Sequence, residues 1–317
     1  MSIEHAGVHI VRKPWGSRDL SPWAKTSSSE PIGEIWFEPA DAARQVDPEL
    51  LLKLIFTKEI LSIQVHPDDD FARLIGLHNG KTEAWYILSA EPGAQVALGL
   101  KVRLTRQELR QAIIDGSIAG IVEWRSVVAG DIVFVPAGTI HAIGAGLVVA
   151  EIQQRSDTTF RLFDYGRDRE IHVDQAVAAA DLGPAKVKTT PVNLTDTRIH
   201  LVSCPFFTLE HITIPPNSDC ELNLKCETWV MVIAGNATFG AVHAGIGVAL
   251  FSSASRTNIR VGRNGVEALF AYADAEPAQD ILCDLRSAKA EPTAPCFENV
   301  SKKQPAHLPF RAKEALL

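Results

Sequence analysis

The stretch from Leu61 to Leu88, LSIQVHPDDDFARLIGLHNGKTEAWYIL, constrains the fold more than any other part of the chain. Its first six residues alternate between apolar and polar side chains. Because successive side chains of a β-strand point to opposite faces, Ser62, Gln64 and His66 are predicted to share one face. A second strand-like run begins at Glu83 after a short insertion. An amide, an imidazole and a carboxylate can therefore converge, and these groups suit a borderline divalent metal.

A fourth candidate ligand lies far downstream, in the segment GDIVFVPAGTIHAIG at residues 130–144. A buried strand is predicted to end at Pro136, and a glycine turn then carries His141 back toward the same surface. The spacing of the glycine, proline, glycine and histidine resembles the second motif of cupin barrels. We therefore predict one metal site, built from Gln64, His66, Glu83 and His141.

Hydrophobic periodicity predicts a mainly β chain with a few short helices. Strands are expected at residues 32–37, 51–56, 61–66, 83–88, 124–128, 131–135 and 147–154. A short helix is expected after Pro67, where three aspartates suit the positive end of a helix. Thr105 and Glu108 form a capping box that predicts a helix over residues 105–120, and a further short helix is expected at 173–181. The first 50 residues are predicted to be rich in loops.

The second half of the chain, residues 187–286, consists of strand-like runs separated by Gly, Asn and Pro turns, as in an all-β sandwich or barrel. Its segment GIGVALFSSASRTNI lacks the proline and the histidine of the 130–144 segment. His200, His211 and His243 do not reproduce the ligand spacing either. We predict a second barrel without a metal, followed by a flexible tail over residues 287–317.

Composition restricts the partners and the compartment. The 317 residues are 46% hydrophobic and 22% charged, with a formal charge of −7, which argues against nucleic acid as a partner because phosphate backbones bind basic surfaces. No apolar run is long enough to span a membrane, and no secretory leader is recognised. The five cysteines form no CxxC pair, so reduced thiols in the cytoplasm are expected.

Several motifs in series resemble one family. QVHPDD, GKTEAWYIL, GDIVFVPAGTIHAIG and EIQQRSDTTFRLFDYGR, preceded by KPWG and GEIW, resemble the type I mannose-6-phosphate isomerases, particularly their short bacterial branch. The similarity covers about residues 14–180 and continues weakly to about 285. It implies two cupin-like β-barrels: a catalytic barrel over residues 1–182, with the helical insertion at about 105–120, and a second barrel over 187–286. It also implies interconversion of mannose 6-phosphate and fructose 6-phosphate, with one zinc ion per chain and a sugar phosphate as the partner.

The same resemblance implies roles for seven residues. The family's metal ligands correspond to Gln64, His66, Glu83 and His141, and its catalytic residues correspond to Arg161, Glu151 and Lys81. Other roles stay open for four of them. Gln64 could hydrogen-bond a neighbouring ligand, Lys81 could be a solvated turn residue, Glu151 could orient His141 or Arg161, and Arg161 could pair with Asp157 or Asp164.

Two other functions are compatible with these residues. His66, His141 and Glu83 could form the 2-His-1-carboxylate set of a cupin Fe(II) dioxygenase. Alternatively, the chain could bind a sugar phosphate without turnover. The sequence does not identify the general base of the isomerisation, and it leaves the oligomeric state open.

Overall fold

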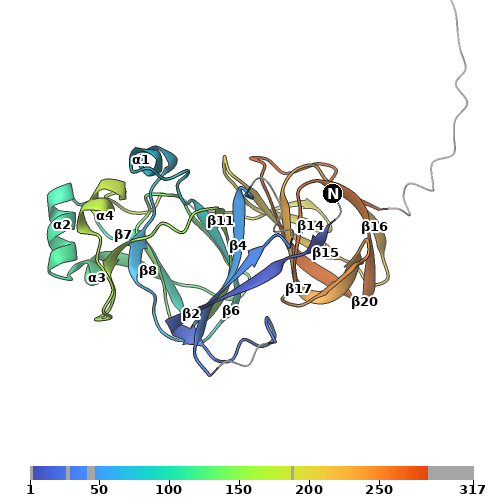
Figure 1. Cartoon of the computed structure of the whole chain (residues 1–317), viewed down its shortest axis with the longest axis horizontal. Coiled ribbons are helices and arrows are strands. Elements are labelled where there is room, and N and C mark those ends of the chain that lie inside the picture. Colours follow the sequence, from blue (N-terminus) through green and yellow to red (C-terminus); the bar gives the residue numbers. More distant parts are fainter. Residues whose placement is uncertain (1–2, 26–28, 41–46, 187–188, 285–317) are drawn as a thin grey trace, which may run out of the picture.

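The computed structural model describes residues 3–25, 29–40, 47–186 and 189–284. These residues form three antiparallel sheets and four short helices (Figure 1). The prediction of a mainly β fold is therefore confirmed. None of the helices in the described part of the chain is long and apolar enough to cross a membrane.

The first half of the chain folds around two sheets. The six-stranded sheet has the order β2 (Gly7–Ser17), β3 (Ile32–Glu38), β4 (Leu50–Thr57), β11 (Leu147–Gln154), β6 (Glu83–Ala90) and β9 (Ile132–Val135). The five-stranded sheet has the order β12 (Phe160–Phe163), β5 (Ile63–Val65), β10 (His141–Ile143), β7 (Gln95–Leu100) and β8 (Val122–Ser126). Both contribute to one buried cluster that includes Trp85, Ile87, Val96 and Ile143. The polar site described below shares this interior.

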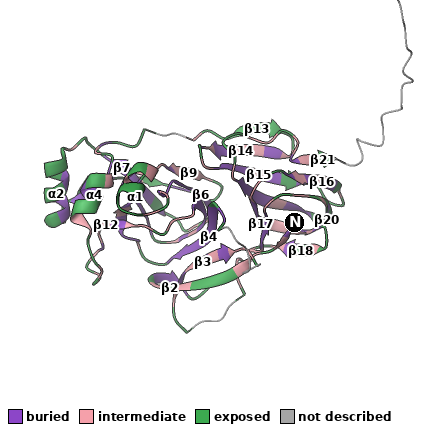
Figure 2. Ribbon diagram, turned by 45° about the horizontal axis from the view of Figure 1, so that its top comes forward, coloured by how far each residue is buried: buried purple, intermediate pink, exposed green. Residues whose placement is uncertain are grey.

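Helices cover the outer face of the five-stranded sheet (Figures 1 and 2). They are α2 (Arg106–Ile114), α3 (Ile118–Ile121) and α4 (Val173–Ala179), and a separate helix, α1 (Asp69–Leu74), follows β5. Leu109 and Ile113 of α2 pack with Ile63 and Val65 of β5 in one buried cluster. Because Ile63 and Val65 face these helices, the polar residues that alternate with them face the barrel interior.

Strands of the second half, with one short N-terminal strand, form a ten-stranded antiparallel sheet that corresponds to the predicted second barrel. Its main path is β1 (Glu4–His5), β19 (Ala249–Ser252), β17 (Thr228–Phe239), β20 (Ser255–Tyr272), β15 (Thr208–Ile214), β14 (Arg198–Ser203) and β13 (Val192–Thr195). Off this path lie β16 (Asp219–Leu224), β18 (Val242–Gly245) and β21 (Leu282–Asp284). The short N-terminal β1 pairs with β19, so the first described strand belongs to the second barrel's sheet. The domain limits at 182 and 187 stay predictions.

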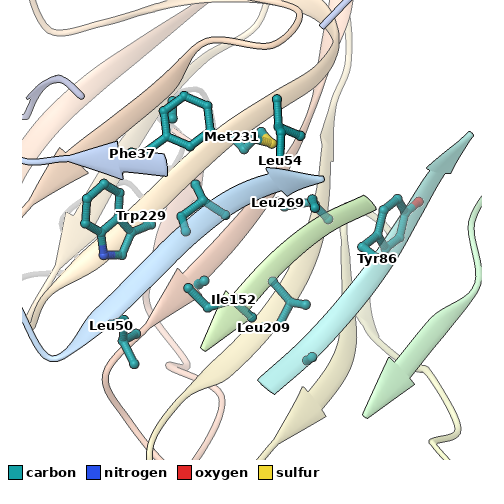
Figure 3. Close-up of a cluster of buried hydrophobic side chains, with 14 of the residues drawn as sticks. Phe37, Leu50, Leu54, Tyr86, Ile152, Leu209, Trp229, Met231 and Leu269 are labelled. Atoms are coloured by element: carbon teal, nitrogen blue, oxygen red, sulfur yellow. The ribbon is translucent and has the colours of Figure 1, made fainter. Parts of the chain in front are cut away.

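The two barrels share a core in which β4 is the central strand (Figure 3). Leu50, Leu52, Leu54 and Phe56 point outward and pack in one buried cluster with residues of the second barrel such as Trp229 and Met231. The alternate residues of β4 point into the first barrel. There Ile55 joins the interior core, and Lys53 lines a polar cleft that is described below. A strand buried on both faces explains why LLLKLIFT is almost continuously apolar.

Three local predictions differ from the structure. The helix expected over 105–120 is broken into α2 and α3, because Gly116 has φ +78° and the chain turns there. The N-terminal region contains the eleven-residue strand β2 paired with β3, so it is less rich in loops than expected. Leu61, which strict alternation would place on the face of Ile63 and Val65, precedes β5 and packs inside the first barrel. The expected tail over 287–317 lies outside the described residues.

Candidate metal centre

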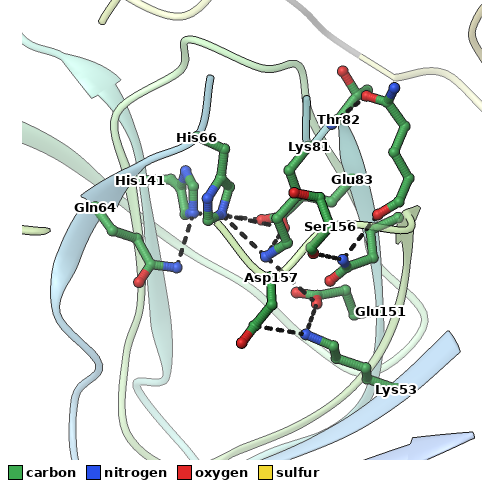
Figure 4. Close-up of polar contacts among 12 residues, drawn as sticks. Lys53, Gln64, His66, Lys81, Thr82, Glu83, His141, Glu151, Ser156 and Asp157 are labelled. Atoms are coloured by element: carbon green, nitrogen blue, oxygen red, sulfur yellow. Dashed lines mark hydrogen bonds and ion pairs between the residues drawn. The ribbon is translucent and has the colours of Figure 1, made fainter. Parts of the chain in front are cut away.

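Strands from both sheets bring the predicted ligands together (Figure 4). His66 directly follows β5, His141 opens β10 in the same sheet, and Glu83 opens β6 in the opposite sheet. Gln64 is the register partner of both His141 and Arg161. Four residues from three segments that are far apart in sequence therefore meet in the barrel interior.

His66, Glu83 and His141 form a compact, buried cluster. His66 Nε2 lies 3.4 Å from Glu83 Oε2, and His141 Nε2 lies 3.4 Å from Glu83 Oε1. All three ligand atoms lie within 4.8 Å of one another. Among the described residues this is the one group of three or more His, Cys, Asp or Glu side chains arranged to hold a metal. The absence of metal from the second barrel stays a prediction.

The hydrogen bonds of the two imidazoles favour metal binding at Nε2. His66 Nδ1 donates to the carbonyl of Thr158, and His141 Nδ1 donates to the carbonyl of Thr139, each at 2.8 Å. This arrangement leaves the Nε2 lone pairs facing Glu83. Glu83 Oε2 is buried and accepts no hydrogen bond of acceptable geometry among the described residues, although Lys81 Nζ lies 2.8 Å from it. Two imidazole nitrogens and a carboxylate of this kind suit a divalent metal.

Gln64 lies beside the cluster with its amide nitrogen 3.2 Å from His141 Nε2. Its oxygen accepts a hydrogen bond from Ser62 Oγ at 3.1 Å. The amide oxygen and nitrogen of glutamine have nearly the same shape. A half-turn rotation of the Gln64 amide would therefore point its oxygen toward His141 Nε2. A serine hydroxyl can donate or accept, so Ser62 is compatible with both orientations. Direct coordination by Gln64 stays a prediction.

Lys81 is a buried member of the centre. Only 4% of the residue is exposed, so the alternative of a solvated turn lysine is wrong. Its ammonium lies 2.8 Å from Glu83 Oε2 and 3.1 Å from His66 Nε2. Burial alone would lower the pKa of Lys81, but the neighbouring carboxylates of Glu83 and Glu151 raise it. Burial and the Lys81 charge lower the pKa of His66 to about 3, which keeps that imidazole neutral and able to bind a metal.

Glu151 is held beside this centre by an indole and two ammonium groups. Trp85 Nε1 donates to both Glu151 Oε2 and Glu83 Oε1, each at 3.1 Å. Lys53 and Lys81 lie 3.8 and 3.9 Å from Glu151 Oε1. The sequence left open that Glu151 orients His141 or Arg161, but the contacts among the described residues join it to Trp85, Lys53 and Lys81 instead. Burial, together with the charge of Glu83, raises the pKa of Glu151 to about 7, where a carboxyl group can take up and release a proton near neutral pH.

Lys53 is a residue of the site that the motif analysis missed. It is 2% exposed, and its ammonium lies 3.8 Å from a carboxylate oxygen of each of Glu34, Glu151 and Asp157. It also lies 4.2 Å from the centre of the Trp36 ring. A lone lysine within an apolar strand is the signal that could have identified it, because a buried charge needs partners.

A polar cleft of about 210 Å³ opens onto this network. Its wall includes Lys13, Glu34, Lys53, Ser62, Gln64, Lys81, Glu151, Asp157, Thr159, Arg161, Arg169 and His172. Arg161 Nε is buried without a hydrogen-bond partner among the described residues. The predicted alternative partners are engaged elsewhere, since Asp164 binds Arg167 and Arg169 and Asp157 lies by Lys53.

His172 fixes the backbone at Arg161. The Arg161 amide donates to His172 Nδ1 at 3.1 Å, and the His172 amide donates to the Arg161 carbonyl at 2.9 Å. Burial and the nearby charge of Arg169 lower the pKa of Arg161. Among the residues that the structure describes, no carboxylate forms an ion pair with the Arg161 guanidinium, which stands at the wall of the cleft.

The ligand cluster predicts a specific loss on mutation. Replacing His141 by alanine removes one of the two imidazoles, so the His141→Ala protein is expected to bind less than a tenth of the zinc that the wild type retains after dialysis. Metal analysis of both proteins checks this, with His243→Ala, in the second barrel, as the matched control. Zinc retention at the wild-type level in His141→Ala would contradict the assigned cluster.

No protein-family model matches the chain. Curated proteins of known name, in contrast, match part of its sequence. The chain is 40% identical over 169 residues to the mannose-6-phosphate isomerase of Streptococcus mutans, a match covering 50% of this chain and 53% of that protein. It is 42% identical over 135 residues to a probable mannose-6-phosphate isomerase of Bacillus subtilis, covering 40% of this chain and 42% of that protein. The matches thus span about half the length of these relatives.

Solved structures extend the similarity to most of the chain. The mannose 6-phosphate isomerase of Bacillus subtilis superposes with a TM-score of 0.73 at 25% identity, covering 86% of this chain and 99% of that one. A phosphomannose isomerase of Salmonella typhimurium gives a TM-score of 0.68 at 14% identity, covering 86% and 100%, which shows a shared fold. The chain is therefore similar to these mannose-6-phosphate isomerases in sequence over about half its length and in fold over most of it.

Proposed function

We propose that the chain is a zinc-dependent aldose–ketose isomerase that interconverts mannose 6-phosphate and fructose 6-phosphate. The observation that carries this proposal is the position of the His66–Glu83–His141 cluster beside Glu151, a buried carboxyl group with a pKa of about 7. The names of the similar proteins support the same reaction. We further propose that the enzyme acts in the cytoplasm.

The charges of the cleft favour a phosphorylated substrate. Five basic side chains line it, from Lys13, Lys53, Lys81, Arg161 and Arg169, against three acidic ones, from Glu34, Glu151 and Asp157. This local excess of positive charge stands in a chain whose formal charge is −7. A dianionic phosphate would offset it, and its binding energy would help to position the sugar.

The reaction moves a proton between C2 and C1 of the open-chain sugar through an enediol. Zinc bound by His66, Glu83 and His141, with Gln64 as the proposed fourth ligand, would act as a Lewis acid toward the substrate oxygens. Two imidazoles and a carboxylate are a frequent ligand set for catalytic zinc. The remaining steps need a base for the carbon-bound proton and cations for the enediolate.

The chain supplies groups for both tasks. We assign the proton transfer to Glu151, because its raised pKa lets it exist in both protonation states near neutral pH. Lys81 and Arg161 would stabilise negative charge on the enediolate oxygens, since both are cations on the cleft wall. An iron dioxygenase would have no evident use for this set of cations, which is why we favour the isomerase.

The direct test is turnover with and without metal. The purified protein is expected to convert mannose 6-phosphate to fructose 6-phosphate in a coupled assay, to lose activity on chelation and to regain it with zinc. Free mannose should react far more slowly, because it lacks the phosphate. Zinc-loaded protein that binds mannose 6-phosphate without converting it would indicate a binding protein, and oxygen consumption with Fe(II) would indicate a dioxygenase.

A substitution at Arg161 tests the role of its guanidinium at the cleft wall. If it stabilises the enediolate, Arg161→Met is expected to lower kcat by roughly 10²–10³, with zinc content and Tm unchanged. Arg161→Lys should restore activity only in part, because an ammonium lacks the planar fork of a guanidinium. Arg256→Met, at an exposed site on the second barrel, is the control. A raised KM with normal kcat would instead assign Arg161 to ground-state phosphate binding.

The raised pKa of Glu151 predicts a pH dependence. A base must be deprotonated to act, so kcat/KM is expected to fall as the pH drops through the pKa of Glu151. That pKa is about 7 without metal, and a bound cation would lower it, so the acid limb should lie at or below pH 7. Glu151→Gln should lose this limb and lower kcat by roughly 10²–10⁴. An unchanged limb in Glu151→Gln would assign the titration to another group.

A further inference from the structure

The segment between His66 and Glu83 sets the distance between two metal ligands. It consists of Pro67, helix α1 and a turn that leads into β6. We infer that Asp69 and Gln154 form a clamp that holds this turn, and that the clamp positions Lys81 and Glu83 against His66. Asp69 and Gln154 are thus positioning residues, and this inference rests on the metal site of the proposed function.

The clamp consists of hydrogen bonds to the backbone on both sides of Lys81. Asp69 Oδ1 accepts from the Gly80 amide at 2.8 Å and from Gln154 Nε2 at 2.9 Å. Gln154 Oε1 accepts from the Thr82 amide at 2.9 Å. The Lys81 amide donates to the Pro67 carbonyl at 3.0 Å. Three consecutive backbone N–H groups are therefore held just before Glu83.

The three aspartates of this segment have different partners. Asp68 caps α1 by accepting from the Phe71 amide at 2.8 Å. The Asp70 side chain is 93% exposed and pairs with Arg73. Asp69 has a more distant ion pair with Arg73, at 3.8 Å, and its side chain is 28% exposed. Among these three, the contacts to Gly80 and Gln154 belong to Asp69, so general helix capping does not explain its position.

The turn also packs tightly against the start of the insertion. A Cβ atom at Gly80 would lie 2.5 Å from the Pro67 carbonyl oxygen and 2.6 Å from the Asp68 carbonyl carbon. Such an approach is too close for any side chain. The backbone at Gly80 is therefore held directly against residues 67–68, which leaves little room for the turn to shift while the clamp is intact.

The turn before Glu83 is also connected to the loop that carries His141. Thr82 Oγ1 accepts from the Ala137 amide at 3.2 Å, and the Gly138 amide donates to the His66 carbonyl at 2.8 Å. Residues 137 and 138 belong to the loop that leads to His141. A displacement at Thr82 would therefore reach the loops of all three ligands. Partners that orient metal ligands in this indirect way typically change metal affinity or activity 10–100-fold when removed.

The experiment compares Asp69→Ala with two matched variants. Asp69→Asn keeps an oxygen that can accept both hydrogen bonds, and Asp70→Ala removes the neighbouring aspartate of the same helix. Zinc affinity is measured by competition with a chromophoric chelator, alongside the Tm of the metal-free protein and kcat and KM for mannose 6-phosphate. Asp69→Ala is expected to bind zinc roughly 10–100-fold more weakly and to lower kcat more than it raises KM. Asp69→Asn and Asp70→Ala should remain close to the wild type.

Gln154→Ala provides a second probe that interrupts the clamp at its other end, and it should show the same loss of zinc affinity. Wild-type zinc affinity in both Asp69→Ala and Gln154→Ala would overturn the inference. An equal loss in Asp70→Ala would overturn it as well, because the effect would then belong to the helix. A lowered Tm of the metal-free protein with unchanged zinc affinity would show that Asp69 only stabilises the fold.

The affinity measurement separates this inference from the proposed function. A wild-type chain that binds zinc without isomerising mannose 6-phosphate would overturn the proposed function. The comparison of Asp69→Ala with Asp70→Ala would still decide whether the clamp positions the ligands, because it needs no turnover.

Discussion

The buried charge of Glu83 is the constraint on which the rest of the centre depends. Its carboxylate lies inside an apolar barrel, where an uncompensated charge would be very costly. Two imidazoles, the Lys81 ammonium and the Trp85 indole all lie within 3.4 Å of its oxygens. The same compensation extends outward, since Lys81 and Trp85 also contact Glu151, and Glu151 contacts Lys53. The candidate site is therefore one connected network of buried charges that links the proposed metal position to the wall of the cleft.

The second barrel supports this network, although no ligand is assigned to it. The outward face of β4 packs on the second barrel, and the inward face of the same strand presents Lys53 to the cleft. Glu227, just before β17, accepts hydrogen bonds from the backbone amides of Glu49 and Leu50, at 2.6 and 2.9 Å. These contacts hold the start of β4 and thereby the wall that carries Lys53. The second barrel can in this way contribute to the geometry of the site without supplying a ligand to the described cluster.

The shared orientation of the side chains before and at His66 could be predicted from sequence because strand alternation is local. Ser62, Gln64 and His66 share a face for the same reason that Ile63 and Val65 share the other, and the structure places the first set in the barrel interior. Lys53 and Asp69 were not identified. Lys53 lies in a run that reads simply as a buried strand, and Asp69 is one of three adjacent aspartates with equal capping potential. Glu34 and Gln154 come from other segments, and Gly80 lies eleven residues beyond Asp69, so local patterns could not distinguish Lys53 and Asp69 from their neighbours.

The sequence by itself determined the mainly β class, the alternation along residues 61–66 and the motifs that resemble those of the mannose-6-phosphate isomerases, since each depends on residues close together in the chain. The tertiary structure decided which charges are buried and which partners they have. Lys81, for which the sequence left a solvated position open, is buried inside the network. Asp164 binds Arg167 and Arg169, and within the described part of the chain Arg161 Nε has no hydrogen-bond partner. Such choices depend on sheet pairing between distant strands, where burial removes water as a competing partner and makes each charge sensitive to its neighbours.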